Sequence, residues 1–506
     1  MTMITTDNAI AIDPAPDGST LLQWLAHDAR TRDRVISDGH QSVSYAETDR
    51  VLRNVDDHFA RCGVTKAHPI ALECSQSVAG AVAILHLLSR KYSVVLLPNL
   101  SEPSKEAGTP RFIPTFCSHV ITASPDKRAG AFSPEHGLPC VANEAFTPDA
   151  ALAGFGGADL YLRTSGSTGA PKLTRMSHQK WLNNAMGCVE RWAITSDDRL
   201  SIPVPIFHSY GFGAAFLPGL LAGAAMDLLA DGNIVSYVER ETRFKPNVAF
   251  LTPAMCDIYL ARRTSPRTYR FVVTAGDKVK RETMAGFETR FGPLLNLYGS
   301  AEMGAVSAAS PADPAASRIG SAGYPFSGIE LRTIDAAVDD DAVVEEGVGT
   351  LQCRQMNGTE GYLTYDGQWR VEPHEESAWF DMKDLAKIRT DGYVEIRGRS
   401  GLSVKRDGLL VVFADVESAL EKVEGVQRAV VLASGERIRG ARLVGICLAE
   451  GNGHAPRPEA VRKKCFELLP RYAVPDEVMI VDHLPQLPSG KINRPALRAL
   501  IARPGD

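Results

Sequence analysis

Residues 164 to 172 read TSGSTGAPK, a run that brings hydroxyl side chains, glycines and one lysine together. Glycine backbones allow successive N–H groups to turn toward one anion, while the hydroxyl groups and Lys172 add further donors and a positive charge. The order differs from the GxxxxGK[ST] pattern, because Lys172 follows Pro171 and precedes Leu173. We therefore predict a phosphate-binding loop of another type, with a Ser/Thr/Gly surface linker as the alternative. Its candidate ligands are Thr164, Ser165, Gly166, Ser167, Thr168, Gly169 and Lys172.

The segments around this loop indicate the elements that position it. Residues 160–162 are typical of the end of a buried strand, and the sequence from Trp181 onward is typical of a helix. We therefore expect the loop at a strand-to-helix turn. Helix-period segments alternate with strand-like runs over residues 20–100, and short apolar runs recur at 248–251 and 270–273. This alternation predicts an α/β fold in which helices cover parallel-rich sheets.

A change of pattern divides the rest of the chain. Residues 336–365 contain an acidic run at 339–341, best explained as a solvated loop, and then short alternating pieces that predict a small antiparallel subdomain. From residue 398 onward, strand-like and helical segments predict a second, smaller α+β unit. We expect a large N-terminal domain over residues 1–400 and a small C-terminal domain over residues 401–506.

Composition narrows the function classes. The chain has 506 residues, with 44% hydrophobic and 23% charged residues, which is the balance of a soluble globular protein. A formal net charge of −5 argues against nucleic-acid binding, which needs a basic face. The nine cysteines are scattered without a CxxC pair, and no long apolar run suggests a membrane span. We therefore expect a cytoplasmic protein.

Six stretches occur in an order that carries a family resemblance. They are TSGSTGAPK, PIFHSYGF (205–212), LYGSAE (297–302), WFDMKD (379–384), GRSGLSVKRDG (398–408) and LPQLPSGKI (484–492). Together they resemble the motif series of the adenylate-forming superfamily, which includes acyl-CoA and aryl-CoA synthetases, luciferases and the adenylation domains of peptide synthetases. The resemblance runs from about residue 20 to the C-terminus. It implies that the domain over residues 1–400 binds AMP and that the small domain over residues 401–506 is mobile.

The resemblance implies a reaction in two half-steps. A carboxylate oxygen attacks the α-phosphate of ATP, which releases pyrophosphate and leaves an acyl-adenylate. A thiol then attacks the acyl carbon and releases AMP. Because the first half-step joins an anion to a polyanion, catalysis must come mainly from positioning and from neutralising charge.

The resemblance also implies a role for individual residues. Lys491 matches the catalytic lysine that offsets charge between the carboxylate and the phosphate, and His208 matches the gate beside the acyl carboxylate. Glu302 matches the glutamate that holds Mg²⁺, a cation that prefers oxygen ligands. Asp384 matches the aspartate that binds the ribose hydroxyls, with Arg399 in support. The remaining positions hold the nucleotide or serve thioester formation: Gly276, Asp277, Tyr298, Gly299, Ser300 and Lys405. Tyr298 should lie on one face of the adenine, with residues 275–277 on the other.

Several positions depart from the family pattern. Ala301 stands where relatives usually have a threonine or serine that contacts the α-phosphate, so one donor is missing unless Ser300 replaces it. Met382 and Lys383 stand where relatives usually have threonine and glycine, and Lys383 could contact a phosphate or simply be exposed. Gly401, at the implied hinge, replaces the more usual Asp or Lys. A lost donor costs on the order of 1–3 kcal/mol, which allows a slower enzyme or a degenerate one.

The segment 205–212 bears on the acid. It holds His208 but no carboxylate to pair with an ammonium group, so an α-amino acid substrate is disfavoured. TAGD (274–277) and YGFG (210–213) are similar to segments of benzoate-type ligases and favour an aryl acid such as a hydroxybenzoate. FHSYG is equally compatible with a fatty acid. The glycines and alanines after Tyr210 could open a pocket or allow tight helix packing.

The thiol acceptor and the rival functions stay open in the sequence. The resemblance allows either CoA or the phosphopantetheine of an acyl carrier protein, and Lys405 and Gly408 are implied on the face that serves thioester formation. The alternatives are a fatty-acid ligase, a nucleotide-binding pseudoenzyme that acts as a scaffold, and a luciferase-like oxygenase.

Overall fold

The computed structural model describes residues 2–4, 15–99, 113–125, 132–148, 158–163, 172–229, 234–265, 267–334, 347–365, 368, 379–399, 402–406, 409–437, 440–450, 455–486 and 492–501. The chain divides into two compact units. The larger unit comprises Thr6–Glu330 and Arg354–Ala378, and the smaller unit comprises Met1–Thr5, Leu331–Cys353 and Trp379–Asp506. The predicted domain boundary at residue 400 stays a prediction.

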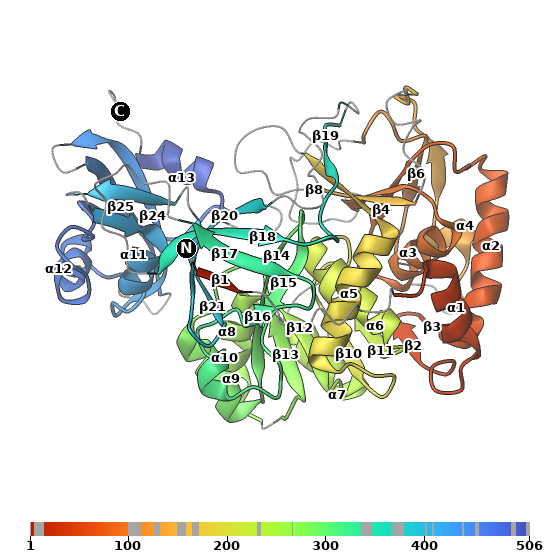
Figure 1. The fold of residues 1–506 in the computed structure, drawn as a ribbon, viewed down its shortest axis with the longest axis horizontal. Helices are drawn as coiled ribbons and strands as arrows, with labels where there is room; N and C mark the ends of the chain where they lie inside the picture. Colours follow the sequence, from red (N-terminus) through yellow and green to blue (C-terminus); the bar gives the residue numbers. More distant parts are fainter. Residues whose placement is uncertain are drawn as a thin grey trace. The chain divides into compact units, whose positions relative to one another are not determined.

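The larger unit contains a nine-stranded sheet with a parallel centre (Figure 1). Its central run of β2, β11, β10, β12, β13 and β14 is parallel throughout. The inner strands VAFL and FVVT are buried at every position, as expected of strands covered on both faces. In sheet order the strands are β16 Tyr324–Pro325, β15 Gly304–Ala308, β14 Leu294–Ser300, β13 Phe271–Thr274, β12 Val248–Leu251, β10 Arg199–Ile202, β11 Ala225–Leu228, β2 Val35–Ser37 and β3 Ser42–Ser44.

A seven-stranded sheet completes the strand framework of the larger unit. Its strands β8, β5, β4 and β6 are parallel, and β9, β19 and β7 add antiparallel edges. In sheet order they are β19 Gly361–Leu363, β9 Leu173–Ser177, β8 Asp159–Arg163, β5 Val94–Pro98, β4 Ile70–Cys74, β6 His119–Thr122 and β7 Cys140–Ala142. The piece EGYLTY was expected in a small antiparallel subdomain, but its strand β19 pairs with β9 in this sheet. Leu363 explains the placement, because it packs with Leu173 and Tyr161 in the sheet core.

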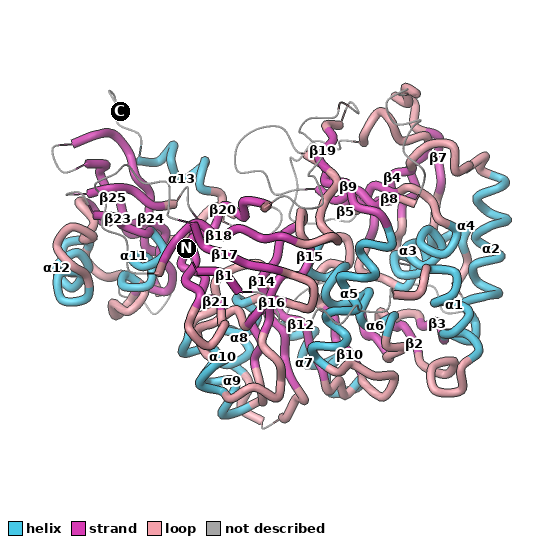
Figure 2. The backbone as a smooth tube through the Cα atoms, in the orientation of Figure 1, coloured by secondary structure: helices cyan, strands magenta, loops and turns pink. Residues whose placement is uncertain are grey.

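Helices connect and cover these strands (Figure 2). Local sequence sets their ends: Thr252 accepts a hydrogen bond from the Met255 N–H and Pro253 opens α8, which is a favoured helix start. The helices of the larger unit are α1 Gly18–His27, η1 Tyr45–Glu47, α2 Thr48–Arg61, α3 Val78–Arg90, α4 Pro134–Gly137, α5 His178–Trp192, η2 Tyr210–Phe216, α6 Leu217–Leu221, α7 Ile234–Phe244, α8 Pro253–Arg262, α9 Arg281–Arg290 and α10 Ala315–Arg318. Within the described ranges, no helix is long and apolar enough to cross a bilayer.

The smaller unit holds two further sheets. The first has the order β1 Thr2–Ile4, β17 Glu330–Ile334, β18 Val348–Arg354, β20 Phe380–Ile388 and β21 Val394–Arg399, with β18, β20 and β21 antiparallel. The second has the order β23 Leu409–Val412, β22 Ser403–Arg406, β25 Gly440–Ala449 and β24 Val426–Arg437, and β26 Glu477–Val481 pairs with β25. The acidic run at 339–341 lies outside the described residues.

Alternating side chains give the second sheet two apolar faces. Ala429 and Val431 of β24 pack with the helices α11 Phe413–Leu420 and α12 Pro458–Leu468. Val430 and Leu432 point the other way and pack with α13 Arg494–Ile501. This period of two along β24 accounts for the α+β character expected of the C-terminal region.

Candidate active site

The predicted residues of the larger unit lie just beyond the carboxyl ends of its parallel strands. His208 follows β10, Gly276 and Asp277 follow β13, and Glu302 follows β14, which ends at Ser300. Because parallel strands end at one edge of the sheet, these segments share that edge. Ligands of open α/β sheets bind at the carboxyl ends of the strands, so this edge is a candidate site.

The hydroxyl-rich segment follows β8 of the neighbouring sheet in the chain. Its predicted ligands Thr164, Ser165, Gly166, Ser167, Thr168 and Gly169 lie outside the described residues. The flanking residues Arg163 and Leu173 are paired in the antiparallel register of β8 and β9. The loop therefore joins two adjacent strands, and the predicted strand-to-helix turn is wrong. The short strand LTRMS was overlooked, and α5 begins only at His178.

Lys172 follows the loop and lies beside a tyrosine that the sequence analysis did not single out. Its Nζ is 5.7 Å from the ring centroid of Tyr362, a distance at which a ring face attracts a cation. The Tyr362 hydroxyl donates a hydrogen bond of 3.3 Å to Glu302 Oε1. Burial, and then the negative charge of Glu302, raise the pKa of Tyr362, so the hydroxyl stays protonated and able to donate. In the sequence, Tyr362 lies within residues 336–365, where only short alternating pieces of an antiparallel subdomain were predicted.

Four hydrogen bonds fix the turn that carries Glu302. Ser300 Oγ accepts from the Met303 N–H at 3.1 Å, and the Thr359 N–H donates to the Glu302 carbonyl at 2.6 Å. Three residues after Glu302, the Ala305 carbonyl accepts from the Asn184 side chain and the Ala305 N–H donates to it, both at 2.9 Å. The Ser300 oxygen is thus engaged as an acceptor within the turn, and its replacement of the donor missing at Ala301 stays a prediction.

The residues present suit the Mg²⁺ ion that the resemblance implies. Glu302 is half-buried, and within the described chain its Oε2 has no hydrogen-bond partner, which leaves a hard oxygen ligand available. Among the described residues no group of three or more His, Cys, Asp or Glu side chains could hold a metal. A single carboxylate matches a cation that is bound through one carboxylate and substrate phosphates.

Gly276 and Tyr298, the residues predicted to enclose a flat base, follow paired positions of two neighbouring strands. Thr274 of β13 is paired with Asn296 of β14, and Gly276 and Tyr298 each lie two residues after these. Gly276 has φ +93°, and apart from its chain neighbours no atom of the described residues lies within 4 Å of the position a Cβ would take. A side chain there would be strained and would fill this space. Asp277 is exposed and accepts from the Lys278 N–H at 2.8 Å, and Gly299 is exposed beside Tyr298.

A buried glutamine holds the segment that leads to His208. Gln76, 6% exposed, donates through Nε2 to the carbonyls of Ile202 and Val204 and accepts through Oε1 from the Ile206 N–H at 2.8 Å. His208 is half-buried, and its backbone N–H donates to the Pro205 carbonyl at 3.2 Å. Sequence analysis missed Gln76 because its partners lie 126 to 130 residues away.

The glycines that follow His208 serve packing. A Cβ on Gly213 would lie 2.5 Å from the Trp181 ring, and one on Gly211 would lie 2.1 Å from the Pro205 carbonyl oxygen. Of the two readings open for this segment, tight helix packing is therefore the one that these two positions support.

The predicted ribose-binding pair lies in the smaller unit. Asp384 of β20 stands opposite Arg399 of β21, and the Arg399 Nε lies 3.1 Å from Asp384 Oδ1. Met382 is 5% exposed and belongs to the core. Lys383 has φ +59°, a left-handed conformation that glycine adopts more readily than other residues. Its Nζ pairs with Asp381 at 2.6 Å. Lys405 lies on β22 with only its backbone described, and Gly401, Gly408 and Lys491 lie outside the described residues.

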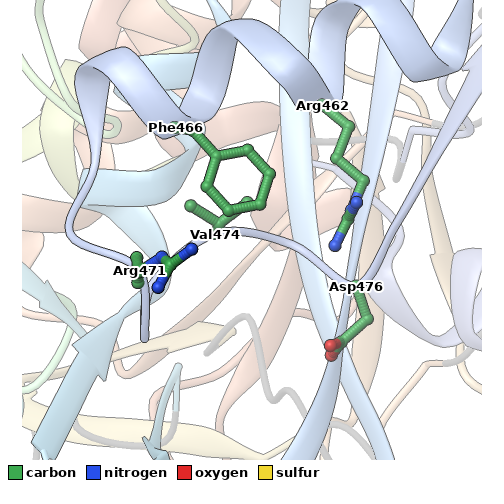
Figure 3. A pocket seen from close by; sticks show the side chains of 5 residues that line it. All are labelled: Arg462, Phe466, Arg471, Val474 and Asp476. Carbon is green, nitrogen blue, oxygen red and sulfur yellow. The ribbon is translucent and has the colours of Figure 1, made fainter.

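A cavity of about 260 Å³ lies elsewhere in the smaller unit (Figure 3). It is lined by Arg462, Phe466, Arg471, Val474 and Asp476. Arg462 donates to the Pro475 carbonyl at 2.8 Å, and Asp476 pairs with Arg406, so part of its polar lining is already engaged. None of the predicted site residues lines this cavity, so it is not the candidate active site.

Comparisons with known proteins identify two matching family models. The model described as AMP-binding enzyme matches residues 160–363, and the model described as AMP-binding enzyme C-terminal domain matches residues 415–491. The first match contains the hydroxyl-rich loop, His208, Gly276, Glu302 and Tyr362, and the second ends at Lys491.

Similar sequences are named as CoA ligases. The oxalate–CoA ligase of Arabidopsis thaliana is 27% identical over 346 residues, which cover 66% of this chain and 66% of that protein. The indoleacetate–CoA ligase of Aromatoleum aromaticum is 27% identical over 354 residues, covering 67% and 66%. The salicylyl-CoA synthase of a Streptomyces species is 24% identical over 364 residues, covering 69% and 64%. The chain thus matches just under two thirds of the length of each of these relatives.

Solved structures resemble the chain over nearly its whole length. ATP-bound MatB from Rhodopseudomonas palustris superposes with a TM-score of 0.76 at 21% identity, covering 96% of this chain and 99% of that one. O-succinylbenzoate CoA synthetase from Bacillus subtilis, in complex with ATP and magnesium, gives a TM-score of 0.73 at 20% identity, covering 94% and 99%. These likenesses confirm the predicted fold class, with a large N-terminal part and a small C-terminal one.

Proposed function

The chain belongs to the adenylate-forming superfamily of AMP-binding enzymes, and from this premise we propose that it is an ATP-dependent acid–thiol ligase. A carboxylate oxygen of the acid attacks the α-phosphorus of ATP, the bond to the β-phosphate oxygen breaks, and pyrophosphate leaves. A thiolate sulfur then attacks the acyl carbon of the adenylate, and AMP leaves. Neither half-step changes the oxidation state of the acid or of the thiol.

One observation supports this proposal most directly: the fixed turn that presents Glu302 at the same sheet edge as Gly276 and Tyr298. In the proposed complex, Glu302 would hold Mg²⁺, which would supply positive charge to the phosphates. Gly276 and Tyr298 enclose the adenine, and Asp384 receives the ribose hydroxyls with Arg399 beside it. Lys172 and the hydroxyl-rich loop bind the phosphates, and Lys491 offsets charge at the reacting carboxylate.

For the acid we propose a carboxylate without an α-amino group. The segment 205–212 has no acidic side chain, and an ammonium buried there would lack a partner. The segments TAGD and YGFG favour an aryl acid such as a hydroxybenzoate. The relatives are named for oxalate, indoleacetate, medium-chain fatty acid and salicylate, so a fatty acid remains the second candidate.

For the acceptor we propose the thiol of CoA, because the relatives are named as CoA ligases. The phosphopantetheine arm of an acyl carrier protein presents the same thiol and is the alternative. A direct comparison of free CoA with a pantetheinylated carrier protein, each added after the acyl-adenylate has formed, separates the two.

Acid-dependent exchange of radiolabelled pyrophosphate into ATP tests the proposed activity. We expect exchange with at least one member of a panel of aryl and fatty acids, and none with α-amino acids. A scaffold that only binds nucleotide, the reading motivated by Ala301, would show no exchange with any acid. Exchange confined to amino acids would overturn the proposed substrate class.

Replacing Gln76 with leucine is expected to raise the KM for the acid more than the KM for ATP. The change leaves the Ile202 and Val204 carbonyls and the Ile206 N–H without their side-chain partner, which loosens the segment that carries His208. Unsatisfied buried groups of this kind cost about 1–3 kcal/mol of stability. Pyrophosphate exchange at varied acid and ATP, together with thermal unfolding, measures both effects.

Gln179 provides the matched control for this prediction. Its side chain also donates to a backbone carbonyl, that of Ala15, but it makes no contact with the 202–206 segment. Gln179→Leu should therefore lower stability without a selective rise in the KM for the acid. Equal changes in both KM values for Gln76→Leu would show that Gln76 acts on the fold as a whole.

A further inference from the structure

Three side chains from separate segments meet at the candidate metal site, and one of them, Glu302, is the candidate metal ligand. Lys172 precedes β9, Tyr362 lies on β19, and Glu302 follows β14. Tyr362 contacts both of the others, with its ring facing the Lys172 Nζ at 5.7 Å and its hydroxyl bonded to Glu302 Oε1 at 3.3 Å. Since β19 belongs to the seven-stranded sheet and β14 to the nine-stranded sheet, Tyr362 joins the two sheets of the larger unit.

We propose that Tyr362 is a positioning residue that orients the Glu302 carboxylate for Mg²⁺ and holds Lys172 for the phosphates of ATP. This inference rests on the proposed function, because it assumes that Glu302 and Lys172 face the metal and the phosphates of ATP. By donating to Oε1, the hydroxyl leaves Oε2 available for a cation. Hydrogen bonds to ligating carboxylates commonly set metal affinity in this way.

The ring and the hydroxyl of Tyr362 serve separable purposes. The ring face attracts the ammonium of Lys172, and a phenylalanine would keep that attraction. The hydroxyl alone reaches Glu302, and a phenylalanine would lose it. A leucine would lose both. If Tyr362 served only to fill the core, all of these changes would act through stability and none would alter the response to Mg²⁺.

Calorimetric titration of ATP, without acid and with or without Mg²⁺, tests this inference on the full chain. For Tyr362→Phe we expect the gain in ATP affinity from Mg²⁺ to fall about tenfold, the effect of losing one hydrogen bond to a charged group, with Mg²⁺-free affinity unchanged. For Tyr362→Leu we expect Mg²⁺-free affinity to fall severalfold in addition. Thermal unfolding of each variant establishes that it is folded.

Tyr161→Phe is the matched control. Tyr161 lies on β8 of the same sheet, and its hydroxyl makes no hydrogen bond to Glu302. This variant should keep the Mg²⁺-dependent gain of the unchanged protein. If the larger substitution Tyr362→Leu does not fold, the gain measured for Tyr362→Phe decides the question.

The outcomes separate the inference from the function beneath it. An unchanged Mg²⁺-dependent gain in Tyr362→Phe, in a protein that binds ATP more tightly with Mg²⁺, overturns the inference and leaves the proposed function intact. A protein that binds no ATP under either condition overturns both. A reduced gain in Tyr362→Phe with an unchanged gain in Tyr161→Phe supports the positioning role.

Discussion

Replacing Lys491 with alanine is expected to abolish adenylation while leaving transfer from a supplied acyl-adenylate to the thiol nearly intact. The first half-step brings a carboxylate to a triphosphate, and a positioned cation lowers the barrier to joining these anions. Losing one group that stabilises developing charge typically costs about 10²- to 10³-fold in rate. In the second half-step the sulfur attacks the acyl carbon and no carboxylate approaches a triphosphate, so this step does not need the lysine. Pyrophosphate exchange measures the first step, and thioester formation from the acyl-adenylate measures the second.

The prediction for Lys491 depends on the sequence PSGKI and the family resemblance, since this residue lies outside the described ones. Lys464→Ala is the matched control, because Lys464 is an exposed lysine of the same unit that pairs with Glu467. It should leave both half-reactions unchanged. A loss of equal size in both half-reactions of Lys491→Ala would show that Lys491 supports the fold or the thiol step, and would remove it from the adenylation step.

The strand framework of the site could be predicted because its signals are local. The apolar runs predicted at 248–251 and 270–273 correspond to β12 and β13, which are buried at every position, and the alternation with helices indicates parallel strands. The family resemblance names Gly276 and Glu302 as site residues, and the parallel strands explain why both follow the same edge of the sheet. The resemblance likewise names Asp384 and Arg399, which the antiparallel hairpin of β20 and β21 places opposite each other.

The supports of the site could not be predicted, because they depend on contacts between distant segments. Tyr362 and Glu302 are separated by 60 residues, and Gln76 bonds to carbonyls more than 120 residues away. No period or motif in one segment encodes such a partner. The hairpin formed by β8 and β9 was missed for a related reason, since β9 is five residues long and directly precedes a strongly helical segment. The position of the edge strand β19 also depends on a distant contact, because Leu363 packs with residues of β8 and β9.

Replacing Glu302 with glutamine is expected to lower the adenylation rate by roughly a hundredfold or more and to remove most of its dependence on Mg²⁺, since metal stabilisation of phosphoryl charge is worth several kcal/mol. Glutamine has the same shape, and its amide oxygen can still accept from Tyr362. The bonds that fix the turn involve backbone groups of residues 302 and 303, so the fold should be nearly unaffected. Exchange rates measured across a range of Mg²⁺ concentrations test this expectation.

Glu360→Gln is the control for Glu302→Gln, because we expect it to lower stability and to leave the Mg²⁺ dependence of adenylation unchanged. Glu360 is close in sequence to Tyr362 but pairs with Lys180 at 3.1 Å and with Arg175 at 3.5 Å. Neutralising it should cost about 1–2 kcal/mol of stability, because two partly buried cations lose a partner. Its Mg²⁺ dependence should stay that of the unchanged protein. If Glu302→Gln instead lost stability and kept its Mg²⁺ dependence, Glu302 would be one more ion-pairing residue of the fold, and the metal would have to be held elsewhere.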